Sequence, residues 1–517
     1  MYGVIFLKRS KAMFYNLILM TATTLLMRFV GVAFNVYLTN RIGAFGIGLF
    51  SLVMSVGAFA VTFATSGVNL AATRLTAEAI GRSSDIAVRQ AMRRCIVYSL
   101  CFGFVGSVGL LLLAEPISLG ILNDARCIRP LRLFSLSLPC ISLSSAMSGY
   151  FTAQRRVIKS AAAQFFEQFV RITVTVHTVG LLAPKGVEYA CIAVILGSAV
   201  AEITSFVFSF ILYRIDLHKH VSHSGEADKY VTRKLLGISL PIALTTYVRS
   251  GLVTVEHLLI PRGLKRSGSS PEAALASYGV LHGMVFPIIL FPQAVLSAFA
   301  GLLVPEISEC VARGEEGRIE HIASRVMQST LAFAVGTAGI MLCYSSLLGR
   351  AIYNNDGASA LIRVLAPLIP MMYLDHVVDG MLKGLGEQLY SMRVNIVDAF
   401  LSVILVYFLV PGFGIYGYVV IVYLMEFINA SLSIARLMSR ISIKIELGKW
   451  VVKPLICIVG ATSVTAIVTS LVGPSGLGTA GDAATAVGIC ALTYFVLLRL
   501  TGGVSGEDLR WFKRAIQ

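Results

Sequence analysis

Arginines, carboxylates and histidines interrupt the long apolar runs of this 517-residue sequence. An ionised group in hydrocarbon costs on the order of 3 kcal/mol on insertion scales, so such groups face partners or a water-filled cavity rather than lipid. They are Arg28, Arg74, Glu78, Glu167, Arg171, Glu202, Arg249, Glu256, His257, Asp375, His376, Asp379, Asp398 and Glu426. These side chains are therefore the first candidates for chemistry.

Some of them have an explanation on their own helix. Glu167 and Arg171 are four residues apart, which places them on one helix face, where they can neutralise each other. Asp375 and Asp379 share a face but carry like charges. Either a cation lies between them, or one is protonated, or Asp379 lies near the cytoplasmic surface beside Lys383, and the short separation favours the last.

Arg28 and Arg249 have no acidic residue within a turn on their own helices. Two guanidinium groups that reach one cavity would suit a phosphate or pyrophosphate, because each binds phosphate oxygens in a bidentate manner. The alternative is an inter-helix salt bridge, for example between Arg28 and Glu256. Glu256 lies two turns after Arg249 on roughly the same face.

The composition indicates a polytopic membrane protein. Hydrophobic residues make up 56% of the chain and charged residues 14%, with a mean hydropathy of +0.80. Soluble chains carry about 25% charged residues. The net charge of +16 does not indicate nucleic-acid binding, because no segment is long enough for a soluble basic domain with interleaved aromatic residues. The nine cysteines show no CxxC pair, so neither a zinc site nor a disulfide framework is expected.

Fourteen apolar runs are long enough to cross a bilayer, which predicts an all-α fold. They cover about 12–38, 46–78, 92–114, 131–153, 158–182, 188–212, 235–260, 274–303, 322–348, 358–382, 389–410, 415–437, 451–472 and 480–500. The first run follows Lys8, Arg9 and Lys11 and is too long for a signal peptide, so it is expected to remain as a helix. Lysine and arginine gather in the loops on the side of the termini, which predicts that both termini are cytoplasmic.

The longest polar stretch between spans, 213–234, predicts two six-helix lobes joined by a cytoplasmic linker. The expected lobes are 1–212 and 235–437, followed by helices 13–14 at 451–500 and a cytoplasmic tail at 501–517. A short likeness between RIGAFGIGLFSLV (41–53) and PGFGIYGYVVIVY (411–423) is the only internal echo that stands out.

No Walker A sequence and no nucleophile elbow are present, and no sizeable domain lies outside the spans. An ATP-driven pump, a hydrolase and a transferase are therefore not expected, and no cofactor is implied. A non-transporting membrane scaffold or an integral transferase is a further alternative, which the short outer loops argue against.

Four segments resemble the polysaccharide-exporter branch of the multidrug/oligosaccharidyl-lipid/polysaccharide (MOP) flippase superfamily, and the last three resemble its stage V sporulation protein B group. They are RFVGVAFNVYLTNRIGAFGIGLFSLVMSVGAFAVTFATSGVNLAATRLTAEA (28–79), ISLPIALTTYVRSGLVTVEHLLIPRGL (238–264), YGVLHGMVFPIILFPQAVLSAFAGLLVPEISE (278–309) and APLIPMMYLDHVVDGMLKGLGEQLYSMRVNIVDA (366–399). The resemblance implies two six-helix lobes around a central cavity, with two further helices in lipid-carrier members. It also implies flipping of a polyprenyl-pyrophosphate-linked sugar such as lipid II by alternating access.

Arg28, in its Arg–x–x–Gly context, matches a pyrophosphate-contacting arginine of the lipid II flippases. A second basic residue often follows near the end of that helix, but Phe34 and Asn35 stand there in this sequence, which leaves a different lipid-linked glycan open. The expected substrate-binding residues are Arg28, Arg74, Arg249, Glu256 and Asn35, and the expected ion-coupling residues are Asp375 and Glu202. The expected partners are a lipid-linked glycan, membrane lipids and a coupling cation (H⁺ or Na⁺) in the bacterial cytoplasmic membrane, and the alternative is a cation-coupled multidrug exporter.

Overall fold

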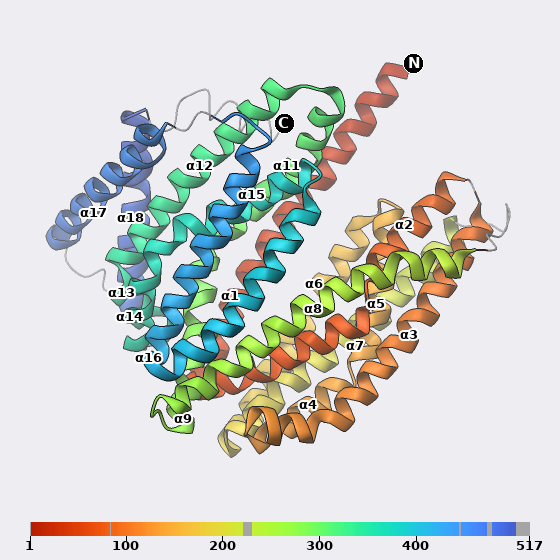
Figure 1. Ribbon diagram of the computed structural model, residues 1–517, viewed down its shortest axis with the longest axis horizontal. Helices are drawn as coiled ribbons and strands as arrows, with labels where there is room; N and C mark the ends of the chain where they lie inside the picture. The colour runs from red at the N-terminus through yellow and green to blue at the C-terminus, as the bar shows by residue number, and fades with distance from the viewer. Residues whose placement is uncertain (1, 83, 221–229, 444–445, 473–477, 503–517) are drawn as a thin grey trace. The chain divides into compact units, whose positions relative to one another are not determined.

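The computed structural model describes residues 2–82, 84–220, 230–443, 446–472 and 478–502, and every regular element in these ranges is a helix (Figure 1). This confirms the predicted all-α class. Within these ranges, ten helices are long and apolar enough to cross a membrane, or eleven if the bent pair Ala125–Ser135 and Leu138–Ala153 forms one span. The count of fourteen is consistent with this but not confirmed, because Gln388–Met438 contains two of the predicted spans and Leu25–Gly81 contains one and part of another.

Two long helices each join two predicted spans across one glycine. Within α1 (Tyr2–Thr65), Gly43 has φ 74° and ψ 173°, and within α16 (Gln388–Met438), Gly414 has φ 62° and ψ −142°. Glycine adopts a positive φ readily because it has no Cβ to meet the neighbouring carbonyl oxygen. The similar segments 41–53 and 411–423 therefore each contain a glycine kink between two consecutive spans.

Contacts between helices divide the chain into two compact units. Unit 1 comprises residues 1–23 and 41–262, and unit 2 comprises 24–40 and 263–517. These bounds differ from the lobe bounds expected from the sequence, which remain a prediction. Residues 24–40 of the first helix pack with unit 2. The helix α8 (Val231–Arg266) packs with unit 1 as far as Arg262. Residues 221–229 of the expected linker and 503–517 of the expected tail lie outside the described residues.

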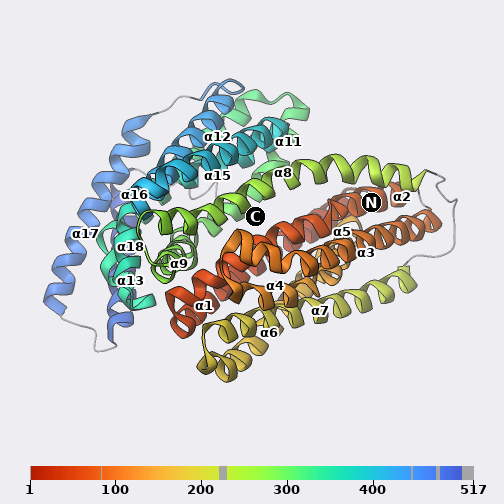
Figure 2. The ribbon, with the colours of Figure 1, turned by 60° about the horizontal axis from the view of Figure 1, so that its bottom comes forward.

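Unit 1 is a bundle in which α6 and α7 lie side by side (Figure 2) and α2 and α3 pack on α5. Its core joins side chains of α2, α3 and α5, including Leu75, Met92, Met147, Tyr150 and Phe151. Besides the second half of α1 and most of α8, its helices are α2 (Val68–Gly81), α3 (Asp85–Pro116), η1 (Ile117–Leu122), η2 (Ala125–Cys127), α4 (Ile128–Ser135), α5 (Leu138–Ala153), α6 (Val157–Leu182), η3 (Ala183–Lys185) and α7 (Val187–His220).

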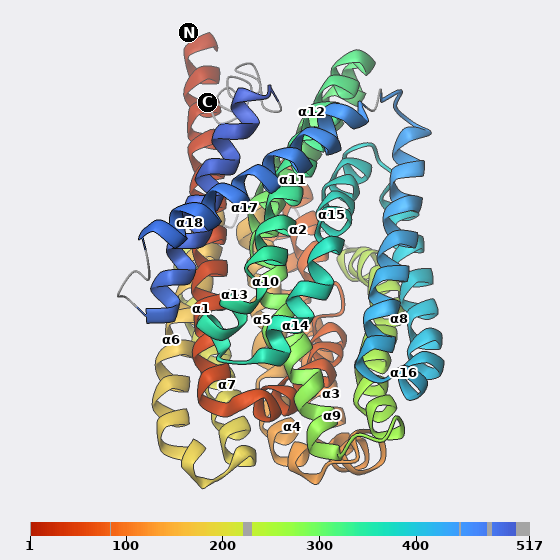
Figure 3. The ribbon, with the colours of Figure 1, turned by 90° about the vertical axis from the view of Figure 1, so that its left-hand side faces the viewer.

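Unit 2 has the same kind of bundle, in which α15 packs on α11, α12 and α16, and two additional helices, α17 and α18, lie beside α12 (Figure 3). Its remaining helices are α9 (Pro271–Gly279), η4 (Val280–Val285), α10 (Phe286–Leu290), α11 (Gln293–Arg313), α12 (Glu316–Cys343), α13 (Ser345–Tyr353), α14 (Asp356–Leu365), η5 (Ala366–Leu368), α15 (Ile369–Gly384), η6 (Gly448–Val452), α17 (Lys453–Val472) and α18 (Gly478–Leu500).

The two units repeat one local pattern, which the sequence reading did not detect. Residues 123–156 and 354–387 match position for position at one constant offset. The matched landmarks are the left-handed Asn123 (φ 51°) with Asn354 (φ 48°), the helix-capping Asp124 with Asn355, Pro139 with Pro370, the closely packed Gly149 with Gly380, and the left-handed Arg155 (φ 56°) with Gly386 (φ 81°). The buried faces of α3 and α12 recur at the same offset: Val88, Met92, Ser99 and Leu110 match Ile319, Ala323, Thr330 and Met341.

The first helices of the two halves, α1 and α8, also match each other, but at a different difference in residue number. Arg28, Asn35 and Arg41 in α1 match Arg249, Glu256 and Arg262 in α8 with identical spacing. The two unpaired arginines predicted to bind phosphate are thus equivalent positions of the repeat. This equivalence could have been found in the sequence, had the two segments been aligned.

A difference between the two halves of the repeat explains why α17 and α18 pack on unit 2. Tyr494 of α18 and Ile458 of α17 lie directly over Gly336 and Gly339 of α12, where a Cβ atom would lie 2.3 Å from either side chain. Glycine is needed there, because any larger residue would push these helices away. At the position of α3 that matches Gly336, unit 1 has Val105, which is 57% exposed, so the surface lacks this recess.

Each unit has a cluster of charged side chains at one loop. In unit 1 this loop follows α5, and in unit 2 it follows α15. In unit 1, the fully buried carboxylate of Asp216 on α7 binds Arg156 and Lys159 and accepts a hydrogen bond of 3.0 Å from Tyr150. In unit 2, the residue that matches Arg156 is Glu387, which binds two arginines near the end of α16. In unit 1 the loop after α5 is basic and the end of α7 is acidic. In unit 2 the loop after α15 is acidic and the end of α16 is basic.

The carboxylate of Glu387 lies 2.8 Å from Arg436 and 2.5 Å from Arg440. The hydrogen bond from Arg436, aided by the charge of Arg440, holds the pKa of Glu387 below its ordinary value of 4.5. Because the folded-state pKa is the lower one, the stabilisation is complete above pH 4.5 and is lost as the pH falls through the folded-state value.

We therefore expect Glu387→Gln to lower the apparent melting temperature of the purified protein at pH 7. The difference from the unmodified chain should shrink below pH 4.5, because the native carboxylate is then protonated as well. Thermal unfolding in detergent between pH 7 and pH 3 measures this. A difference that stayed constant over that range would show that the ion pairs are not its cause.

Candidate substrate- and ion-binding residues

Arg28 lies on the part of α1 that belongs to unit 2. Its side chain is exposed, and it has no ion-pair partner among the described residues. The neighbouring Phe29 packs on Phe291, at the end of α10, with ring centroids 6.1 Å apart, which fixes this turn of α1 within unit 2. The Arg28 guanidinium is within electrostatic range of His376 on α15.

Asn35 lies two turns further along α1 and is half-buried. Its side-chain oxygen accepts a hydrogen bond of 3.1 Å from Thr39 on the next turn of the same helix. This bond satisfies one of the polar groups of Asn35 and leaves its amide hydrogens for another partner.

Arg249 lies on α8 in unit 1 and is also exposed, with no ion-pair partner among the residues that the structure describes. Side chains next to it attach α8 to the second half of α1. Tyr247 donates to Ser66 at 2.7 Å and stacks on Phe63, and Ser250 lies 3.2 Å from Thr62.

Glu256 is half-buried two turns beyond Arg249 and does interact within the protein. It is therefore not a free carboxylate.

Arg74 is exposed on α2, and within the described residues it has no ion-pair partner. It lies about 12 Å along the chain axis from Ser66, at a helical rise of 1.5 Å per residue. One turn beyond it, Glu78 binds Arg82 and lies 2.9 Å from Lys234 at the start of α8. The start of α8 lies against α2 beside Glu78, whereas the turn of α8 that carries Arg249 lies against the end of α1, so the structure does not bring Arg74 and Arg249 together.

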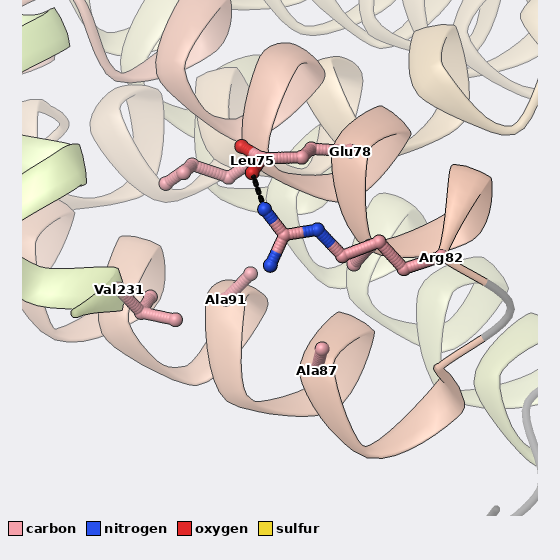
Figure 4. A pocket seen from close by; sticks show the side chains of 7 residues that line it. Leu75, Glu78, Arg82, Ala87, Ala91 and Val231 are labelled. Carbon is pink, nitrogen blue, oxygen red and sulfur yellow. Dashed lines mark hydrogen bonds and ion pairs between the residues drawn. The ribbon is translucent and has the colours of Figure 1, made fainter. Parts of the chain in front are cut away.

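The small pocket beside Glu78 is not a substrate site. Leu75, Ala87, Ala91 and Val231 line it, and Glu78 and Arg82 pair across its rim (Figure 4). Its volume of about 20 Å³ holds no more than one water molecule. The cluster therefore fastens α8 to α2 instead of binding a ligand.

Glu202, expected to couple an ion, takes part in a three-residue cluster. The Arg171 guanidinium binds Glu167 on α6 and lies 3.2 Å from Glu202 on α7. The predicted pairing of Glu167 with Arg171 is thus confirmed. Because two carboxylates share one cation, the cluster keeps one excess negative charge when both are ionised.

Asp375, the other expected ion-coupling residue, lies in an acidic group of unit 2. Asp375 on α15 and Asp398 on α16 both act electrostatically on Glu426 of α16. Asp398 matches Glu167 in the repeat, but Ser402 stands where unit 1 has Arg171. No grouping of His, Cys, Asp or Glu with metal-binding geometry occurs in the described part of the chain.

The neighbouring Asp379 has a local partner. Its carboxylate lies 2.6 Å from the Lys383 ammonium group, one turn along α15. The predicted pairing of these two residues is therefore confirmed, although Asp379 also acts electrostatically on Asp375 of the acidic group.

Many long apolar helices built around an internal repeat define a multi-pass membrane protein of the kind seen in secondary transporters. The family described as "Polysaccharide biosynthesis protein" matches residues 13–311, and the family described as "MatE" matches residues 267–408. The chain belongs to the polysaccharide biosynthesis protein family, in the polysaccharide-exporter branch of the MOP superfamily.

Two related proteins of Bacillus subtilis (strain 168) cover most of the chain. Stage V sporulation protein B is 24% identical over 406 residues, which are 77% of this chain and 78% of that protein. Lipid II flippase MurJ is 19% identical over 418 residues, which are 75% of each chain. Both similarities extend over the two units.

Solved structures support the same fold. The inward closed conformation of lipid II flippase MurJ has a TM-score of 0.70 at 13% identity and covers 93% of this chain and 98% of that one. The inward-facing conformation of a multidrug resistance MATE family transporter has a TM-score of 0.61 at 13% identity and covers 80% and 94%. Transporters of two kinds therefore share this architecture.

Proposed function

We propose that this chain is a flippase that moves a polyprenyl-pyrophosphate-linked oligosaccharide or peptidoglycan precursor across the bacterial cytoplasmic membrane by alternating access. It acts as a transporter and not as an enzyme, and both termini are cytoplasmic. The observation that carries the proposal is Arg28, an exposed guanidinium on an apolar helix with no ion-pair partner among the described residues. A phosphate group supplies the missing counter-charge through two parallel hydrogen bonds.

Other residues take supporting roles in this proposal. Arg249 and Arg74 provide further phosphate contacts at successive stages of transport, and Glu256 neutralises an arginine when no substrate is bound. Asn35 offers amide hydrogen bonds to the glycan. An amide at this position, instead of a basic residue, suits a lipid-linked glycan other than lipid II.

Either the membrane potential or a cation gradient drives the cycle. Moving one charge across the full field is worth about 2.3 kcal/mol per 100 mV, which is enough to bias a carrier. Asp375 and Glu202 are the proposed ion-coupling residues for H⁺ or Na⁺, because each belongs to a group with excess negative charge.

An outer-face accessibility assay tests the function. Proteoliposomes would be loaded with a fluorescent undecaprenyl-pyrophosphate-linked sugar on the inner leaflet, and its arrival on the outer leaflet followed with an impermeant quencher. Flipping that depends on the protein supports the proposal. Export of cationic dyes without any flipping of the lipid would contradict it.

That contrary result would favour the alternative, a cation-coupled multidrug exporter. Its specific support is the match to the MatE family over residues 267–408, which include Asp375 and Asp398. An acidic group in this segment suits a cationic substrate as well as a coupling cation.

A further inference from the structure

Within electrostatic range of Arg28, unit 2 has an imidazole with one ring nitrogen available to a ligand. His376 on α15 is half-buried, and its Nε2 atom lies 2.9 Å from the Ser297 hydroxyl on α11. Its other ring nitrogen, Nδ1, has no hydrogen-bond partner in the described part of the chain and is not among the enclosed polar atoms. An accessible imidazole nitrogen on a membrane helix suggests a ligand.

From these positions we infer that His376 binds the same phosphate group as Arg28, with Ser297 holding the imidazole in the donating form. This inference rests on the proposed function and names a ligand beyond the arginines.

Ser297 can select the tautomer that donates. Its hydroxyl has one hydrogen and two acceptors in reach, Nε2 of His376 at 2.9 Å and the carbonyl oxygen of Gln293 at 3.1 Å. When Ser297 donates to Nε2, the imidazole carries its hydrogen on Nδ1, where a phosphate oxygen can accept it. When Ser297 donates to Gln293 instead, Nε2 carries the hydrogen and Nδ1 cannot donate.

The charges that act on His376 are of both signs. Asp379 on the same helix acts most strongly, and Arg28 of α1 and Lys383 act with the opposite sign. Because Asp379 and Lys383 pair with each other, the net formal charge of these three groups is that of Arg28. Asp375, the preceding residue, acts on Glu426 of α16.

The matching positions of unit 1 lack this arrangement. Ser66 matches Ser297, but its hydroxyl is occupied by Tyr98 at 2.8 Å and by Tyr247 at 2.7 Å. The residue that matches His376 is Ser145. A serine thus stands in unit 1 where unit 2 has the imidazole, so the inference predicts that Arg28 contributes more to phosphate binding than its repeat equivalent Arg249 does.

Binding of farnesyl diphosphate to the full chain in nanodiscs tests this, with farnesol as a probe that lacks the phosphates. We expect His376→Ala to raise the Kd for farnesyl diphosphate about tenfold, and Ser297→Ala to raise it about threefold. Combining His376→Ala with Arg28→Ala should cost less than the product of the two effects, because both side chains bind one group. Farnesol binding should not change. His282→Ala is the matched control, because that imidazole packs between Tyr278 and Tyr418 in the same unit.

The outcomes separate the inference from the proposed function. If farnesyl diphosphate binds in an Arg28-dependent manner but His376→Ala changes the Kd less than twofold, the inference is wrong and the flippase proposal stands. An equal loss of farnesol binding would also overturn it. If the unmodified chain does not bind the diphosphate, or binds it without Arg28, the proposed function fails. His376→Leu, which keeps the volume of the side chain, replaces His376→Ala if the latter does not fold.

Discussion

Proteoliposomes that contain Arg28→Ala are expected to flip a pyrophosphate-linked precursor roughly 10 to 150 times more slowly than those with the unmodified chain. A hydrogen bond to a charged group contributes about 1.5–3 kcal/mol, and each 1.4 kcal/mol corresponds to a factor of about ten. Arg28 has no ion-pair partner among the described residues, so its removal leaves no protein carboxylate unpaired. The loss of rate should therefore come from the substrate and not from misfolding.

Two variants make the result specific. Arg28→Lys should fall between alanine and the unmodified chain, because an ammonium group keeps the charge but lacks the planar fork that binds two phosphate oxygens. Arg393→Ala removes another exposed arginine, from the first turns of α16, and should leave the rate unchanged. Normal flipping by Arg28→Ala, with loss of drug efflux alone, would contradict the flippase proposal.

The largest loss of stability is expected for Asp216→Ala, about 3 kcal/mol. Its carboxylate is fully buried and binds Arg156, Lys159 and the Tyr150 hydroxyl. Breaking a buried ion pair by removing one partner costs about 3–5 kcal/mol. We expect the lower end, because Arg156 and Lys159 are both 28% exposed and can turn toward water.

Chemical denaturation of the purified protein measures this loss. The matched control is Glu115→Ala, which removes the exposed pair with Arg132 in the same unit and should cost less than about 1 kcal/mol. The charge-reversed pair Arg156→Glu with Asp216→Arg should recover part of the stability, because unit 2 already uses that polarity. If Asp216→Ala and Glu115→Ala unfolded at the same denaturant concentration, the buried cluster would not be stabilising.

The sequence predicted contacts that lie within one helix. Glu167 with Arg171 and Asp379 with Lys383 are each four residues apart, and helical geometry alone brings them together. The all-α class followed in the same way from the length and hydropathy of the runs. The predicted breaks between spans at 39–45 and 411–414 contain Gly43 and Gly414, but hydropathy does not show that a single glycine kink, instead of a loop, makes each turn.

Contacts between distant segments could not be predicted in this way. His376 was recognised as an intramembrane residue, but its position near Arg28 depends on 24–40 of α1 packing in unit 2. No spacing rule relates residues so far apart in the chain. The same applies to Glu202, whose ion pair with Arg171 crosses from α7 to α6. The predicted phosphate roles of Arg28, Arg74, Arg249, Glu256 and Asn35 remain predictions.

The opposite polarity of the two loop clusters has a consequence for assembly of the chain. Two similar halves made in succession can exchange segments while they fold, as in domain swapping. If the loop that carries Arg156 met the helix end that carries Arg436 and Arg440, cations would face cations. If the loop that carries Glu387 met Asp216, two carboxylates would face each other. Such like-charge contacts raise the free energy of the exchanged arrangement. The opposite signs of the two clusters therefore favour pairing of each loop with the helix end of its own half.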